Sequence, residues 1–197
     1  MYKRCIKRIL DIIGALILMP FVLLVIIVLA PIIYFTDKGP VFYNAQRLGV
    51  KGRPFKMYKL RSMYVNVPDL RNNDGSTYNN DSDGRVTPIG RFMRKTSLDE
   101  FPQFINVLTG DMSFVGPRPT IGKIDYENCS EEIRKRYDVK PGVTGYAQAY
   151  YRNSISQEEK FKWDAYYSDN VSFVLDVKIV FMTFFSVVMR RNINSSK

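Results

Sequence analysis

The chain has 197 residues, and its 29 lysines and arginines against 19 aspartates and glutamates give a formal net charge of +10. It has no histidine, which excludes Ser-His-Asp and Cys-His catalysis, a histidine general base and a His-Glu-x-x-His zinc site. Cys5 and Cys129 form no C-x-x-C pair, so neither a zinc ribbon nor a disulfide framework is indicated and a reducing, cytoplasmic setting is expected. The positive charge indicates an anionic partner, which could be nucleic acid, a phospholipid surface or a phosphorylated substrate.

An apolar segment near the N-terminus favours the membrane among these partners. Residues 12–36 carry no charge, and at about 1.5 Å per residue such a helix could cross a bilayer core of about 30 Å. A plain spanning helix is one interpretation, whereas a cleaved signal peptide is disfavoured because the run is long and no clear A-x-A site follows. Basic residues flank both ends and Pro20 interrupts the run, so the positive-inside preference draws both ends to the cytoplasm. We therefore expect residues 1–36 to form a re-entrant helix hairpin, with the spanning helix as the alternative.

The remaining residues, 37–197, predict a globular α+β body that lies on the cytoplasmic face of the membrane. Two β-prone runs, 40–48 and 54–63, are joined by a glycine-bounded turn and predict a small β-hairpin. A long polar loop follows at 66–87. Helices are expected at 102–109, 130–137 and 156–169, the last as a packed amphipathic helix, and an interfacial amphipathic helix is expected at 179–189.

Two adjacent carboxylates, Asp99 and Glu100, stand out in this basic chain. Ser97 and Glu100 have the S-x-x-E spacing of a capping box, in which the pair would only start a helix. Pro102 argues for a later start, because a proline costs nothing at the first helical position but forfeits a hydrogen bond further in. Asp99 and Glu100 would then lie in the turn before the helix, where they are available for chemistry.

Basic residues surround this acidic pair on both sides in the sequence. Arg91, Arg94 and Lys95 precede it, and Arg118 follows within Gly-Pro-Arg-Pro. Arginine suits phosphate because its planar fork binds two oxygens at once. Together with the membrane segment, this pattern indicates an enzyme that holds a diphosphate, offers a carboxylate to phosphorus and receives a lipid substrate.

The chain resembles the bacterial sugar transferases, specifically the small monotopic polyprenyl-phosphate phosphoglycosyl transferases. The resemblance covers nearly the whole chain, and the segment over residues 94–119 is the most specific part. The matching motifs are KRILD, GPVFYNAQRLG, FKMYKLRSM, RKTSLDEFPQFINVLTGDMSFVGPRP, KPGVTGYAQ, YYRN and SFVLDVKIVF.

The resemblance implies transfer of a sugar phosphate from a UDP-sugar to polyprenyl phosphate at the cytoplasmic face of the bacterial inner membrane, as the first membrane step of glycan assembly. It also implies Mg²⁺ and a monotopic α+β membrane protein, in which a re-entrant membrane helix over 1–36 is followed by a cytoplasmic catalytic domain over 37–197 that lies on the membrane face. Asp99 takes the place of the family's nucleophile, and Glu100 completes the dyad. Since Mg²⁺ commonly binds one or two carboxylates together with substrate phosphates, Asp99 is also the candidate metal ligand. Substrate-binding positions around the diphosphate and dyad fall on Lys59, Arg94, Arg118, Arg152 and Asp176.

The chain departs from the family pattern at three places. Met19-Pro20 replaces the usual Ser-Pro of the membrane helix, Tyr146 replaces a frequent tryptophan, and the loop over 66–87 is longer than in compact members. Two other functions stay open: a membrane-tethered nucleic-acid binder and a non-catalytic membrane scaffold. A nucleic-acid binder would leave the acidic dyad unexplained, so we expect no nucleic acid among the partners. The sequence does not specify the sugar, the lipid length or the oligomeric state.

Overall fold

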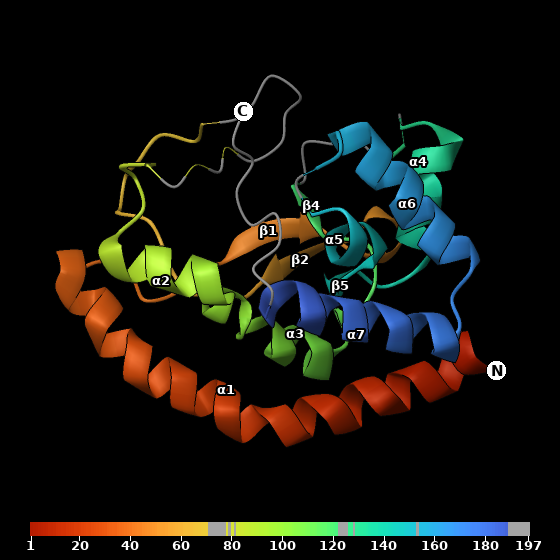
Figure 1. Cartoon of the computed structure of the whole chain (residues 1–197), viewed down its shortest axis with the longest axis horizontal. Coiled ribbons are helices and arrows are strands. Elements are labelled where there is room, and N and C mark those ends of the chain that lie inside the picture. Colours follow the sequence, from red (N-terminus) through yellow and green to blue (C-terminus); the bar gives the residue numbers. More distant parts are fainter. Residues whose placement is uncertain are drawn as a thin grey trace.

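The structure is a computed structural model that describes residues 1–70, 78, 80, 82–121, 126–127, 129–152 and 154–188. Mixed helices and short strands build an α+β body, and one long helix runs along its edge (Figure 1). The helices are α1 (Lys7–Asp37), α2 (Pro88–Thr96), α3 (Gln103–Thr109), α4 (Glu131–Lys135), α5 (Tyr146–Tyr150), α6 (Gln157–Asp169) and α7 (Phe173–Val188). The strands are β1 (Ala45–Leu48), β2 (Pro54–Met57), β3 (Ser113–Val115), β4 (Thr120–Ile121) and β5 (Gly142–Thr144).

The N-terminal segment forms one continuous helix, α1, and the expected hairpin is not confirmed. Pro20 and Pro31 both lie inside this helix, and Figure 1 shows it curving around the body without a break into two arms. A proline removes one backbone hydrogen bond, which bends a helix without ending it when packing holds both sides. By length and composition α1 could cross a membrane, with a mean hydropathy of 3.3 over its most apolar window.

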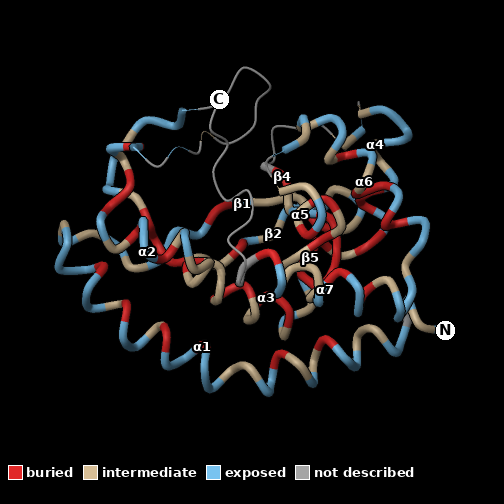
Figure 2. Tube along the Cα trace, viewed as in Figure 1, coloured by how far each residue is buried: buried red, intermediate tan, exposed pale blue. Residues whose placement is uncertain are grey.

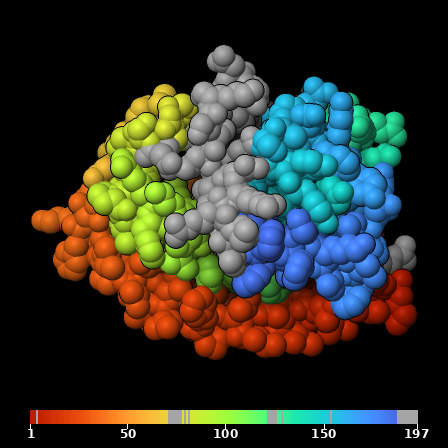
Figure 3. Space-filling view, in the orientation of Figure 1, coloured from red at the N-terminus to blue at the C-terminus, as the bar shows by residue number. Residues whose placement is uncertain are grey.

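One side of α1 packs on the body and the rest is exposed. Ala15, Val22 and Ile33 are almost fully buried, and Figure 2 shows that buried positions recur along the side facing the body. In the space-filling view, α1 forms a continuous band along one edge of the molecule (Figure 3). A solvated protein rarely exposes so large an apolar strip, so this face is compatible with a lipid environment. Its exposed side chains include Ile13, Leu16, Ile17, Phe21, Leu24, Ile27 and Phe35.

The β-hairpin expected from the sequence is confirmed, although its strands are shorter than predicted. β1 and β2 pair antiparallel from Ala45 opposite Met57 to Leu48 opposite Pro54, around a one-turn 3₁₀ helix at Val50–Gly52. β4 adds to the other side of β1, which leaves β2 at the edge of the sheet. Beyond Met57 the pairing continues outside the named strands, since the Tyr43 N–H donates to the Lys59 carbonyl at 2.8 Å and the Arg61 N–H to the Val41 carbonyl at 2.9 Å. Leu60 also joins this segment to the acidic pair, because its N–H donates to the carbonyl of Asp99 at 2.9 Å.

The expected helices are present, with corrected boundaries. The helix predicted at 102–109 is α3, and the one at 156–169 is α6, which begins with a capping box of Ser156 and Glu159. The one at 130–137 is the short α4 followed by a 3₁₀ turn, and the one at 179–189 is the end of the longer α7. The exposed residues of α7 include Phe173, Val174, Val177, Val180, Phe181 and Phe184, so its interfacial position stays a prediction that this face supports.

Several elements were not predicted, namely α2, β3, β4, β5 and α5. α2 has a readable start, because Thr87 accepts a hydrogen bond from the Gly90 N–H and Pro88 occupies the first turn. The parallel pair of β3 and β5 and the five-residue α5 are too short for a periodic pattern to reveal. The polar loop predicted over 66–87 includes residues 71–77, 79 and 81, which lie outside the described residues.

Candidate active site

Asp99 and Glu100 lie in a one-turn 3₁₀ helix, Leu98–Glu100, between α2 and α3. The capping-box interpretation of this segment is wrong. Ser97 has a left-handed backbone with φ of 59°, and its side chain makes no cap hydrogen bond. Because α3 begins only at Gln103, after Pro102, the two carboxylates lie in the turn before the helix, as the position of Pro102 predicted.

Two cations contact these carboxylates. Lys59 Nζ lies 2.9 Å from Asp99 Oδ2 and 3.3 Å from Glu100 Oε1, and Arg118 Nη2 lies 3.1 Å from the same Glu100 oxygen. The Asp99 side chain is only 3% exposed, whereas that of Arg118 is 55% exposed. The site is therefore a row of side chains with alternating charges, which runs from the buried Asp99 through Lys59 and Glu100 to Arg118 at the surface.

The charges in this row of side chains stabilise one another. Burial alone would raise the pKa of Glu100, but the attraction of Arg118 and Lys59 outweighs it and holds that pKa at about 2. Burial would likewise lower the pKa of Lys59, but Asp99 and Glu100 raise it above its ordinary value. Glu100 also raises the pKa of Arg118. Glu100 and both cations are thus charged at neutral pH.

Arg94 approaches the site from the last turn of α2. Its Nε donates to Ser62 Oγ at 3.0 Å, and Ser62 lies three residues after Lys59. Gly90 allows this approach, because a side chain there would collide with the carbonyl of Ser62. Burial lowers the pKa of Arg94, and the nearby Asp99 charge partly opposes that shift, which places this guanidinium within electrostatic reach of the dyad.

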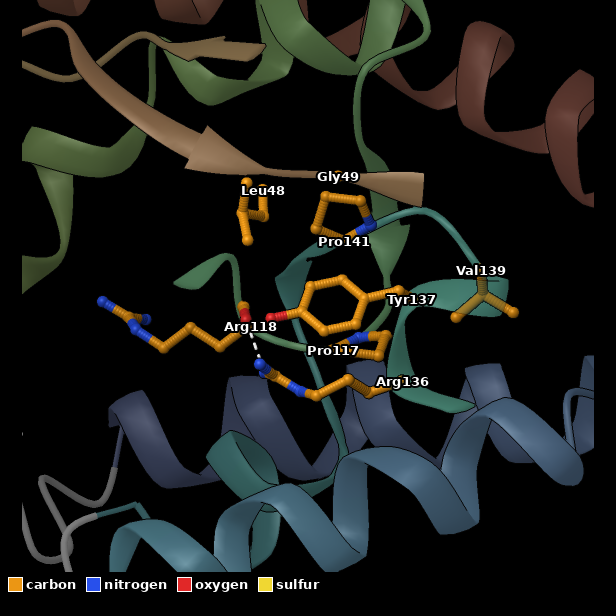
Figure 4. A pocket seen from close by; sticks show the side chains of 8 residues that line it. All are labelled: Leu48, Gly49, Pro117, Arg118, Arg136, Tyr137, Val139 and Pro141. Atoms are coloured by element: carbon orange, nitrogen blue, oxygen red, sulfur yellow. Dashed lines mark hydrogen bonds between the residues drawn. The ribbon is translucent and has the colours of Figure 1, made fainter. Parts of the chain in front are cut away.

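The loop that carries Arg118 is supported from behind by a buried ion pair. Arg136 Nη2 donates to the Arg118 carbonyl at 2.8 Å and to Asp164 Oδ2 at 2.6 Å. Figure 4 shows the Arg136 guanidinium reaching this carbonyl, while the Arg118 side chain extends away from it. The small hollow around these residues is lined by Leu48, Gly49, Pro117, Arg118, Arg136, Tyr137, Val139 and Pro141.

The other two predicted substrate-binding residues are not joined to the dyad by these contacts. Asp176 is buried in a separate polar cluster, where it accepts hydrogen bonds from Tyr2 at 2.6 Å, Lys7 at 2.6 Å and Tyr167 at 2.7 Å. That cluster anchors the chain's N-terminus to α7. Arg152 follows α5 with a positive φ of 49°, and its N–H donates to the carbonyl of Ala147. The roles of both residues at a diphosphate stay predictions.

The carboxylates of the site suit a metal that the substrate also binds. Within the described ranges, no group of three or more carboxylate or thiol side chains is placed to hold an ion by itself. Mg²⁺ does not require one, because it commonly takes one or two carboxylates and completes its shell with water and substrate phosphates. Asp99 Oδ2 is buried, and its partner among the described residues is the Lys59 ammonium at 2.9 Å, so this carboxylate is the group that a cation bound at the site would contact.

The sequence profile described as bacterial sugar transferase matches residues 2–190, nearly the whole chain. The chain belongs to the bacterial sugar transferase family. This sugar transferase is 39% identical over 191 residues to EpsL of Bacillus subtilis (strain 168), described as an uncharacterized sugar transferase, with 96% of this chain and 91% of the relative covered.

Two longer relatives carry more specific names. The galactosyl transferase CpsE of Streptococcus agalactiae serotype III is 40% identical to this chain, and the alignment covers 90% of this chain and 41% of CpsE. The UDP-glucose:undecaprenyl-phosphate glucose-1-phosphate transferase of Escherichia coli (strain K12) is 39% identical, with 93% and 40% covered. The chain thus spans about two fifths of these two relatives.

Sequence reasoning missed two residues that shape the site of the sugar transferase. Ser62 holds Arg94, and Arg136 holds the backbone of Arg118. Ser62 lies within the FKMYKLRSM motif, so proximity to Lys59 was its available signal. The sequence contains no comparable signal for Arg136, because its partner Asp164 is 28 residues away in the chain.

Proposed function

We propose that this sugar transferase moves a sugar 1-phosphate from a UDP-sugar to polyprenyl phosphate, such as undecaprenyl phosphate, and releases UMP. The products would be polyprenyl-diphospho-sugar and UMP, at the first membrane step of glycan assembly. The name of the Escherichia coli relative supports this reaction class. The observation that carries the proposal is the buried Asp99 carboxylate, paired with Lys59 at 2.9 Å beside a Glu100 that Lys59 and Arg118 both contact.

The first step would be an attack of an Asp99 carboxylate oxygen on the phosphorus that bears the sugar. The new bond joins Asp99 to phosphorus, and the bond between this phosphorus and the bridging oxygen breaks, so UMP leaves with the electron pair. Attack by one anion on another requires neutralisation of charge. Lys59 and the half-exposed Arg118 supply two positive charges at this place, with Arg94 as a third within reach.

The second step would return Asp99 to its starting state. A phosphate oxygen of polyprenyl phosphate attacks the same phosphorus, and the bond from Asp99 to phosphorus breaks with its electrons returning to the carboxylate. Covalent catalysis of this kind divides one difficult exchange into two easier ones. It also allows the small soluble UMP to leave before the lipid phosphate enters the site.

Mg²⁺ belongs to the proposal, with Asp99 as its candidate protein ligand. When bound, it would neutralise charge on the diphosphate oxygens. The side chains keep their own tasks: Arg118 orients the diphosphate at the surface, and Lys59 holds Asp99 in place. Their charged states follow from the raised pKa of Arg118 and of Lys59.

The lipid substrate fits the exposed apolar faces of α1 and α7. Both helices leave large hydrophobic side chains uncovered, including Ile17, Ile27, Phe181 and Phe184. We place these faces in the cytoplasmic leaflet of the bacterial inner membrane, with the body in the cytoplasm. Such a position would bring the phosphate end of polyprenyl phosphate and a soluble UDP-sugar to the same side of the membrane.

The test is UMP release from a panel of UDP-sugars by the purified protein, before any polyprenyl phosphate is added. One sugar should give UMP in a burst, and mass spectrometry of the quenched protein should place a sugar-phosphoryl adduct on the peptide containing residues 97–103. Asp99→Asn, which is nearly isosteric, should fold and form no adduct. Intersecting initial-rate lines, no adduct and an active Asp99→Asn would together refute the covalent mechanism, and a protein inactive with every UDP-sugar would favour the scaffold.

A further inference from the structure

Asn106 is a fully buried polar residue in the middle of α3, seven residues after Asp99 in the sequence and 0% exposed. Its side-chain oxygen accepts a hydrogen bond from the Tyr58 N–H at 2.9 Å, and its amide nitrogen donates to the Lys56 carbonyl at 2.8 Å. A buried amide without partners would be unfavourable, so we expect both of its groups to be satisfied. Both of these partners are backbone groups of β2 or of the residue directly after it, and the amide nitrogen also lies 3.5 Å from Asp111 Oδ2.

These two bonds complete an edge that the sheet leaves open. β2 is the outer strand in the order β2-β1-β4, so among the described strands none pairs with the other side of its backbone. Outer-edge backbone groups must find other partners. The amide of Asn106 supplies one acceptor and one donor, as a paired strand would, and its orientation follows from these partners because Tyr58 offers an N–H and Lys56 a carbonyl.

The strand that Asn106 holds leads directly to the site. Lys59 is the residue after Tyr58, and its Nζ contacts both carboxylates of the dyad. On the other side, α3 begins three residues after Glu100, so Asn106 and the dyad belong to the same short stretch of chain. The Leu60 N–H also donates to the Asp99 carbonyl, which closes the connection beyond Lys59.

We infer that Asn106 is a positioning residue that sets the distance between Lys59 and Asp99 by fixing the Lys56–Tyr58 backbone on α3. The contact joins two segments 48 residues apart in the sequence, one carrying the cation and one carrying the carboxylate. This inference rests on the proposed function, since the distance matters only if Asp99 reacts. Displacing a reacting group by about 1 Å can lower a rate by roughly a hundredfold.

The experiment measures kcat and KM for UMP release in Asn106→Ala, per folded protein, with the sugar that the wild type uses. We expect kcat to fall by roughly tenfold to a hundredfold, with a smaller change in KM. Val107→Ala is the matched control, because Val107 is the next residue of α3, is also 0% exposed and packs in the apolar cluster with Ala15, Met57 and Met112, so the variant removes packing against β2 and keeps the hydrogen bonds of Asn106. It should lower the melting temperature and leave kcat per folded protein unchanged.

A double-mutant cycle separates positioning from a general structural role. If Asn106 acts through Lys59, then Asn106→Ala should change kcat by less than about twofold in a Lys59→Met background. A merely structural role would produce the same factor in both backgrounds and would overturn the inference. Asn106→Ser keeps a polar group but is too short to reach both backbone partners, and it replaces Asn106→Ala in the cycle if the alanine variant does not fold.

The outcomes distinguish this inference from the function on which it rests. Wild-type release of UMP together with normal kcat in Asn106→Ala would overturn the inference alone. Equal losses of kcat in Asn106→Ala and Val107→Ala would also overturn it, because position would then matter no more than packing. No UMP release by the wild type with any UDP-sugar would overturn the proposed function, and this inference with it.

Discussion

The pair formed by Lys59 and Asp99 predicts a specific pattern of stability. Lys59→Met keeps much of the aliphatic volume of the side chain and removes its charge, which leaves Asp99 buried without its cation. The Asp99 side chain is 3% exposed and Lys59 Nζ lies 2.9 Å from it, so little water is available to replace the lost partner. We expect Lys59→Met to destabilise the fold and Asp99→Asn to relieve much of that effect in the double variant.

The magnitude follows from the exposure of the groups. Removing one partner of a fully buried ion pair destabilises a protein by about 3–5 kcal/mol. The Lys59 side chain is 21% exposed and Glu100 is 20% exposed, so part of the interaction is screened by water. A loss of about 2–3 kcal/mol is therefore expected. For a protein of this size it corresponds to a fall in melting temperature of about 4–12 °C.

The assay is thermal unfolding of the detergent-purified protein, followed by circular dichroism, for wild type, Lys59→Met, Asp99→Asn and the double variant. Lys162→Met is the control, because the exposed Lys162 pairs with Glu158 on the surface of α6 and should leave the melting temperature nearly unchanged. Equal melting temperatures for Lys59→Met and the double variant would refute the reasoning, since Asp99 would then not carry an uncompensated charge.

Three further predictions address the site and the membrane segment. Arg118→Lys keeps the charge but loses the planar fork, so UMP release should fall about tenfold or more while the melting temperature is retained; near-normal release would show that Arg118 does not clamp the diphosphate. The folded-state pKa of Glu100 is lowered from 4.5 to about 2, so its contribution to stability is present above pH 4.5 and is lost as the pH falls through about 2. The melting temperature of wild type should therefore drop more steeply than that of Glu100→Gln below pH 4.5, and parallel curves would contradict this assignment. The exposed Cys5, in a Cys129→Ser background, should resist a membrane-impermeant maleimide in intact cells and react after lysis, because both ends of the membrane segment are predicted to be cytoplasmic. Labelling of intact cells would instead favour a spanning helix.

Short-range patterns in the sequence predicted much of the fold. The glycine-bounded turn between two β-prone runs predicted the hairpin of β1 and β2, and Pro102 predicted the start of α3. These features depend on neighbouring residues, so they can be read along the chain. β3 and β5 could not, since each has three residues and they pair across a separation that no local signal spans. Their pairing depends on Gly116 and Gly142, which meet so closely that a side chain on either would collide with the other's backbone.

What the sequence by itself determined is the chemical content of the site: an acidic pair without histidine, an arginine between prolines and an apolar segment long enough for a membrane. The tertiary structure decided which of the candidate residues meet. Lys59 and Arg118 reach Glu100 across 41 and 18 residues, whereas Asp176 turns to the N-terminus and binds Tyr2 and Lys7. Residue types and motifs record what a side chain can do, but a distance between segments far apart in the chain arises only when helices and strands pack.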